Sequence, residues 1–169
     1  MTTTLLLVRH GETIDNVNRI MQGQTQGELT ETGVRQASNL AESLANTHID
    51  IYMSSDLKRA YDTCRIIAGE GRNIIQTPLL RERDWGSFTG KYIPELQGKI
   101  WPDDLETQAS MEARASSFLN MLRKKYNGKT VLAVGHGIIN KVIQAVFYSK
   151  RMSDIPRMEN AEVRTLFIE

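Results

Sequence analysis

Two of the three histidines in the sequence stand one residue after an apolar run and beside glycine. His10 lies in LLLVRHGET (residues 5–13) and His136 lies in VGHG (residues 134–137). A neutral imidazole held still at the end of a strand can act as a nucleophile or exchange protons. Arg9 offers a planar guanidinium suited to phosphate or carboxylate, and its charge favours the neutral form of the neighbouring ring. Gly11 is expected to let the backbone turn sharply and a substrate approach closely.

A second cation and a carboxylate could complete such a site. Arg59, in SSDLKRA (residues 54–60), is expected in the first turn of a helix, where its charge opposes the helix dipole. A bound anion would remove that conflict, whereas the alternative is an ordinary solvated side chain. Glu82, in LRE (residues 80–82), could protonate a departing oxygen, although alone it would pass for a surface carboxylate.

Together these residues suggest phosphoryl transfer to a histidine. The two arginines would neutralise a phosphate, one imidazole would attack it, and the second would stabilise the spreading negative charge. Such a set does the work of a magnesium ion, so neither a metal nor another cofactor is expected. The sequence contains no HExxH or GxxxxGK[ST] pattern.

Strands are needed to position these residues. Apolar runs predict buried strands at 3–8 and 130–134, further strands at 49–53 and 74–77, and an edge strand at 163–168. Apolar residues at helical spacing predict helices over 30–45, 57–68, 111–126 and 139–147, with Thr30 as an N-cap. This alternation predicts an α/β fold with a mostly parallel sheet covered on both faces. Ligands bind beyond the carboxyl ends of such strands, where both histidines are expected.

Composition limits the remaining possibilities. A chain of 169 residues, 40% of them hydrophobic, fits one domain over 1–169. With 21 basic and 20 acidic residues, no nucleic-acid or membrane partner is expected, although a balanced total can hide a cationic pocket. The lone Cys64, the lack of a membrane-length apolar run and the lack of a signal-peptide pattern predict a cytoplasmic protein. The sequence does not indicate an oligomeric state.

The ordered motifs resemble those of the histidine phosphatase superfamily, in its phosphoglycerate-mutase-like branch. They are RHGET (9–13), LTETG (29–33), SSDLKRA (54–60), LRE (80–82) and GHG (135–137), and they span nearly the whole chain. The resemblance implies a three-layer α/β/α sandwich and a phosphohistidine intermediate. Carried over by position, His10 would accept the phosphoryl group, Glu82 would donate the proton, and the phosphate pocket would comprise Arg9, Asn16, Arg59 and His136, bordered by Gln22, Gly23 and Gly137.

The departures from the family pattern favour a phosphatase over a mutase. Phosphoglycerate mutases of the family are longer and carry basic residues in an insertion after the acid, whereas residues 90–110 here contain no paired arginines. We therefore expect hydrolysis of a small phosphorylated metabolite. A phosphoglycerate mutase or other phosphotransferase, a protein-phosphohistidine phosphatase and a non-catalytic domain that binds a phosphorylated ligand are the alternatives.

Selectivity is expected to reside in residues 86–110, from which the sequence names no substrate. Glycines and prolines predict an irregular segment over 86–102. Trp85, Tyr92 and Trp101 lie in or near it, and each could either line the substrate side or cover the core. Cys64 falls at a helix-core position, so it is expected to serve packing rather than redox chemistry.

Overall fold

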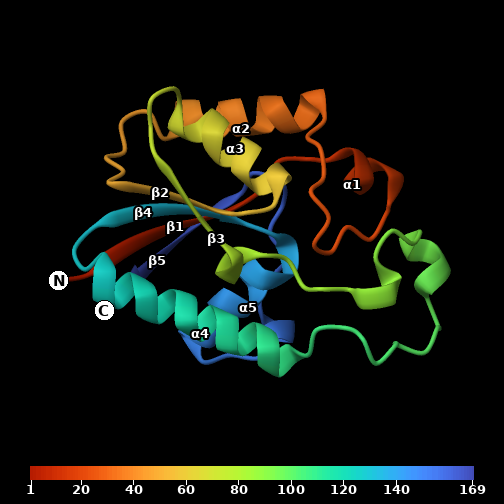
Figure 1. Ribbon diagram of the computed structural model, residues 1–169. Coiled ribbons are helices and arrows are strands. Elements are labelled where there is room, and N and C mark those ends of the chain that lie inside the picture. The colour runs from red at the N-terminus through yellow and green to blue at the C-terminus, as the bar shows by residue number, and fades with distance from the viewer.

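The computed structural model describes residues 1–169 as a five-stranded sheet with helices on both faces (Figure 1). The strands lie in the order β3-β2-β4-β1-β5. Four of them run parallel, and β5 pairs with β1 in the antiparallel direction at the edge. This arrangement confirms the three-layer α/β/α fold. The strands are β1 (Thr3–Arg9), β2 (Ile51–Ser55), β3 (Ile74–Thr77), β4 (Thr130–Gly135) and β5 (Val163–Ile168).

Two pairs of helices cover the sheet. In Figure 1, α2 (Glu31–Ser43) and α3 (Lys58–Ala68) pack together above it, and α4 (Gln108–Lys125) and α5 (Gly137–Tyr148) pack together below it. A one-turn helix, α1 (Ile14–Asn18), lies to the right, beyond the carboxyl end of β1. None of the helices is long and apolar enough to cross a membrane.

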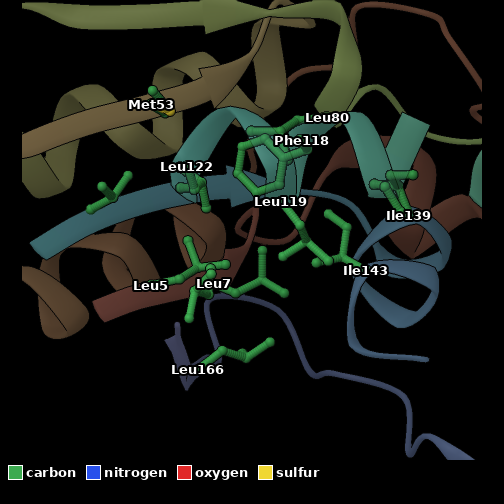
Figure 2. Close-up of a cluster of buried hydrophobic side chains, with 14 of the residues drawn as sticks. Leu5, Leu7, Met53, Leu80, Phe118, Leu119, Leu122, Ile139, Ile143 and Leu166 are labelled. Atoms are coloured by element: carbon green, nitrogen blue, oxygen red, sulfur yellow. The ribbon is translucent and has the colours of Figure 1, made fainter. Parts of the chain in front are cut away.

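The central strands β1 and β4 are buried on both faces, as their continuous apolar sequences predict. Alternate residues of the two strands belong to two separate clusters. Leu5 and Leu7 join the larger cluster with α4 and α5, and Figure 2 shows them beside Phe118, Leu119 and Leu122 of α4. The neighbouring residues of the same strand, among them Leu6 and Val8, join the cluster under α2 and α3.

The structure differs from the predicted elements in three places. The strand expected at 49–53 runs over Ile51–Ser55, two residues closer to the carboxyl edge. The helix α1 was not predicted; Thr13 caps it through reciprocal hydrogen bonds with Asn16. The segment 86–102 is irregular, as expected, but includes two short 3-10 turns, Gly86–Phe88 and Ile93–Leu96.

Candidate active site

A cavity of about 240 Å³ opens where the carboxyl ends of β1 and β4 meet the segments that follow them. The structure places eight of the nine candidate residues in its wall: Arg9, His10, Asn16, Gln22, Gly23, Arg59, Glu82 and Gly137. The ninth, His136, does not line the cavity. Its side chain is fully buried, with the ring centroid 5.2 Å from that of His10.

The two histidines are neighbours because of the strand register. Arg9 of β1 stands opposite Gly135 of β4, so each strand delivers its histidine one residue later. The backbone N–H of His10 donates to the carbonyl of Gly135 at 3.2 Å and extends the ladder past the end of the strand. The imidazole planes meet at 60°. Two residues that are 126 positions apart in the sequence are thereby held side by side.

His10 is held as a neutral ring with one nitrogen free. Its Nδ1 lies 2.7 Å from the carbonyl oxygen of Gly11, and because a carbonyl only accepts, Nδ1 must carry the proton. The lone pair is therefore on Nε2. Burial, followed by the charge of Arg59, holds the pKa of His10 well below its usual value. A neutral imidazole with Nε2 unprotonated is the form that can attack phosphorus.

His136 is also neutral but has no partner. Burial, then the charge of Arg59, holds its pKa well below the usual value. Neither Nδ1 nor Nε2 forms a hydrogen bond, although both atoms are buried. Buried polar atoms of this kind are uncommon, because leaving them unpaired costs free energy. A neutral ring with a free N–H beside His10 is suited to donate to an oxyanion.

Arg9 and Arg59 are buried cations that each keep N–H groups without a protein partner. Arg9 Nη1 donates to the carbonyl of Met158 at 2.7 Å. Arg59 Nη2 donates to the carbonyl of Gly23 at 2.8 Å, and Nη1 donates to that of Thr25. The Nε atoms of both arginines are buried without a partner. Burial lowers the pKa of Arg59 to about 10, so this side chain remains positive at neutral pH.

The carboxylate of Glu82 occupies the N-terminus of α5. Its Oε2 accepts from the backbone N–H of Ile138 at 3.1 Å, and its Oε1 accepts from those of Ile139 at 3.1 Å and Arg83 at 2.9 Å. Two of the first backbone N–H groups of this helix therefore bind the side chain of Glu82, which keeps that carboxylate in the wall of the cavity.

Thr13 positions two of the polar residues in the cavity wall. Its side chain accepts from the backbone N–H of Asn16 at 3.0 Å, and Asn16 Oδ1 accepts from the N–H of Thr13 at 3.1 Å. The Thr13 hydroxyl also donates to Gln22 Oε1 at 3.0 Å. Asn160 Nδ2 also donates to Asn16 Oδ1 at 3.3 Å. The amide nitrogen of Asn16 forms no hydrogen bond with the protein.

Gly11 serves a close backbone contact. A Cβ on Gly11 would lie 2.6 Å from the carbonyl oxygen of Gly33, and a Cβ on Gly33 would lie 2.1 Å from that of Glu12. Gly11 does not adopt a positive φ, so glycine is not needed here for a left-handed backbone conformation. The missing side chains instead allow the turn that carries His10 to pack directly against the first turn of α2.

The cavity also includes residues that were not among the candidates from the sequence. Its wall contains Lys141, Arg157, Ile20 and Ile93. Trp85, which was expected either to line the substrate side or to cover the core, also lies in this wall. Lys141 could have been found, because it follows Gly137 by four residues on the same face of an expected helix. Arg157 lies in an irregular segment with no pattern to mark it.

Tyr92 and Trp101, the other two aromatic residues for which two positions were open, are exposed. Tyr92 and Trp101 are 41% and 57% exposed, so neither covers the core, and neither lines the cavity. Trp101 meets Trp85 edge-on at 5.9 Å between ring centroids. Arg83 lies over both of these rings. Trp85 therefore connects the cavity wall to the exposed part of the segment.

Comparison with known proteins agrees with this geometry. Residues 5–169 match the model of the histidine phosphatase superfamily (branch 1). A metal-independent phosphoserine phosphatase of Arabidopsis thaliana is 33% identical over 98% of this chain and 76% of its own. A probable phosphoglycerate mutase, GpmB, of Proteus mirabilis is 37% identical over 78% of this chain and 68% of its own.

A solved structure shares the fold. Phosphoserine phosphatase from Entamoeba histolytica, crystallised in complex with 3-phosphoglyceric acid, superposes with a TM-score of 0.87 at 28% identity, covering 96% of this chain and 89% of the other. The expected resemblance is therefore confirmed over nearly the whole length. The chain belongs to branch 1 of the histidine phosphatase superfamily.

Proposed function

We propose that this protein is a metal-independent phosphatase that hydrolyses a small phosphomonoester through a phosphohistidine on His10. The observation that carries the proposal is the state of His10: a neutral ring whose free Nε2 shares one cavity with two buried arginines and a carboxyl group. The Arabidopsis relative is named as a metal-independent phosphoserine phosphatase, which supports the same reaction class.

In the first step, Nε2 of His10 attacks phosphorus. A P–N bond forms as the P–O bond to the substrate breaks, and Glu82 transfers a proton to the departing oxygen. The free N–H groups of Arg9 and Arg59 and the ring of His136 stabilise the negative charge on the transferred group.

In the second step, water replaces the alcohol. Glu82, now a carboxylate, accepts a proton from the water as its oxygen attacks phosphorus. The P–N bond breaks, its electrons return to Nε2 of His10, and inorganic phosphate leaves. The hydrogen bond from Nδ1–H to Gly11 keeps the ring in one orientation through both steps.

We further propose that residues 1–169 act as one catalytic domain in a cytoplasm, where phosphorylated metabolites are available. The single cysteine, Cys64, is buried, and burial raises its pKa to about 12, which keeps it as an unreactive thiol. Its place in the core agrees with a packing role.

Phosphoryl transfer to a second hydroxyl is the second candidate, because one relative is named as a probable phosphoglycerate mutase. The first step would be the same, and the phosphoryl group on His10 would then pass to another oxygen of the substrate. Isomerised phosphoglycerate in excess over released phosphate would identify this reaction. Release of phosphate without isomerisation would exclude it.

The test uses p-nitrophenyl phosphate in excess chelator, because its leaving group departs without a proton from the enzyme. We expect the wild type to release phosphate. When the reaction is run with substrate labelled in the phosphate and is quenched rapidly in alkali, we expect an acid-labile labelled phosphoryl group on the protein. His10→Ala should react at least about a thousandfold more slowly and carry no label, because the proposed nucleophile is missing. Glu82→Gln should still trap label from this substrate but hydrolyse alkyl phosphates poorly.

Two results would contradict the proposal. Equal rates for the wild type and His10→Ala would remove His10 as the nucleophile. Complete loss of wild-type activity in chelator, restored by a divalent metal, would show that Arg9 and Arg59 do not suffice. Thermal unfolding of each variant serves as the control for folding.

A further inference from the structure

The charge in the cavity exceeds what one phosphate needs. Four cationic side chains line it (Arg9, Arg59, Lys141 and Arg157) against one acidic side chain, Glu82. The chain as a whole is nearly balanced, with 21 basic and 20 acidic residues. A phosphomonoester carries up to about two negative charges at neutral pH, which the two buried arginines can balance. The positive charges of Lys141 and Arg157 are then left without a balancing negative charge from the phosphate.

Arg157 stands close to Arg9, and Lys141 lines the same cavity from α5. Lys141 is one helical turn after Gly137 on the same face of α5, and a Cβ on Gly137 would lie 3.5 Å from Arg9 Nε. Arg157 directly precedes Met158, whose carbonyl accepts from Arg9 Nη1 at 2.7 Å. Burial lowers the pKa of Arg9 and the charge of Arg157 lowers it further, so these two charges are close enough to repel.

Neither of these cations is committed to a protein partner. The side chains of Lys141 and Arg157 form no ion pair and no hydrogen bond, although other arginines at this end of the sheet do: Arg81 pairs with Asp56 and Arg114 pairs with Glu106. Lys141 is half-buried, where an unpaired charge is costlier than on an open surface. Two free cations in the wall of a cavity are therefore available to an anionic ligand.

We propose that Lys141 and Arg157 form a second anion subsite, so that the enzyme selects phosphomonoesters that carry another anionic group, a carboxylate or a second phosphate. This inference rests on the proposed function, since it places the phosphate of the same molecule against His10. Arginine can grip either group with two parallel hydrogen bonds, and lysine adds a point charge. The wall offers no acidic side chain besides Glu82 to pair with a cationic substrate.

Matched substrate pairs test the subsite. 3-Phosphoglycerate against glycerol 1-phosphate isolates the carboxylate, and 1,3-propanediol bisphosphate against the monophosphate isolates a second phosphate. We expect the wild type to favour the anionic member of at least one pair by about ten- to a hundredfold in kcat/KM, because hydrogen bonds to charged groups have about this strength. The pair that shows the preference identifies the anion.

Variants assign that preference to the two residues. Lys141→Met, Arg157→Gln and their combination should bring the ratio toward one, mainly by raising KM for the anionic substrate. Arg157→Glu, at an exposed position, should favour O-phosphoethanolamine, which carries an ammonium group. Lys124→Met and Arg65→Gln, on exposed helix positions outside the cavity, should keep the wild-type ratio.

Calorimetry separates this inference from the proposed catalysis. We expect His10→Ala to bind 3-phosphoglycerate or the bisphosphate more tightly than its matched partner, whether or not the wild type turns it over. Turnover without any preference in either pair, or an unchanged preference in the double variant, would overturn the subsite and leave the phosphatase intact. Preferential binding without wild-type turnover would support the subsite and overturn the proposed function.

Discussion

At the scale of single residues, His10 and His136 show how burial adjusts the pKa of an imidazole. Both rings are almost completely excluded from water, and both lie near Arg59. Desolvation and a neighbouring cation act in the same direction on an imidazole, and both hold its pKa well below 6.5. Burial and Arg59 thereby keep His10 in the neutral form that the proposed attack on phosphorus requires.

This feature predicts a dependence of stability on pH. The unfolded chain takes up a proton at each histidine below about pH 6.5, while the folded protein does not, so the free energy of unfolding falls as the pH is lowered. Each buried histidine should contribute a slope of about 1.4 kcal/mol per pH unit between pH 6.5 and its lower folded-state pKa. Urea unfolding between pH 7.5 and 5 measures this slope.

A variant of one histidine separates that effect from other titrations. His136→Asn should flatten the slope by about 1.4 kcal/mol per pH unit, because one of the two buried groups is gone. A steep slope that survives in His136→Asn would show that other groups cause the loss of stability.

A residue of the site could be predicted from the sequence only where its neighbours in the chain mark its role. Arg9 and His10 were evident because a buried strand, a cation and an imidazole are adjacent in the sequence. Arg157 reaches the cavity from an irregular segment, so only the folded chain shows its position. The hydrogen bonds of Glu82 to α5 were also hidden, because they join segments 56 and 57 residues apart.

At the scale of elements, the turn after β1 depends on its contact with α2. Gly11 and Gly33 let the two backbones approach, and the Thr30 side chain, which caps α2, also donates to Glu12 Oε1 at 2.8 Å. The N–H of Gly11 donates to Thr63 Oγ1 on α3 at 3.0 Å. Two helices thus hold the turn that carries His10.

We expect Gly33→Ala to damage both stability and activity. In an ordinary helix this change stabilises by about 0.5–1 kcal/mol. Here the added Cβ would lie 2.1 Å from the carbonyl oxygen of Glu12, so the variant should lose about 1–3 kcal/mol instead. Displacement of the turn should lower kcat by about tenfold or more. Urea unfolding and phosphate release measure the two effects.

An exposed position of the same helix provides the control. Asn39→Ala should stabilise α2 slightly and leave kcat unchanged, because Asn39 is exposed and lies outside the cavity. A Gly33→Ala protein as stable and active as the wild type would show that the turn tolerates a shift of α2.

The elements themselves were predictable where their patterns were long. Continuous apolar runs identified β1 and β4, and helical spacing identified the four longer helices to within a few residues of their ends. The one-turn α1 has five residues, too few to show a period, and its capping pair, Thr13 and Asn16, departs from the usual Ser/Thr with Glu/Gln. Short elements near a site depend on tertiary contacts.

At the scale of the whole molecule, the buried core is divided unequally, with the larger cluster between the sheet and the α4–α5 pair. Phe118 of α4 is fully buried there, and it lies near Leu80 and Leu119 in Figure 2. We expect Phe118→Ala to lower the free energy of unfolding by about 3–5 kcal/mol, because it leaves a cavity between the sheet and α4. Chemical denaturation measures the loss.

The same substitution at the sheet edge supplies a matched control. Phe167 of β5 is 63% exposed, so Phe167→Ala should change the free energy of unfolding by less than about 1 kcal/mol. Similar losses in the two variants would contradict the assignment of the core to the α4–α5 side. The alternation of strands and helices predicted both layers, but only the structure shows that the larger cluster lies on this side.

The pairing of β1 with β4 links the packing of the apolar core to the relative position of His10 and His136. In a strand, a slip of one residue turns every side chain to the opposite face, and here it would expose Leu5 and Leu7 to the wrong layer. The same slip would move His10 by one residue relative to His136, so the two rings would no longer lie side by side. The buried leucines and valines of the two strands, which lie outside the cavity, therefore fix the strand register that places the two imidazoles side by side.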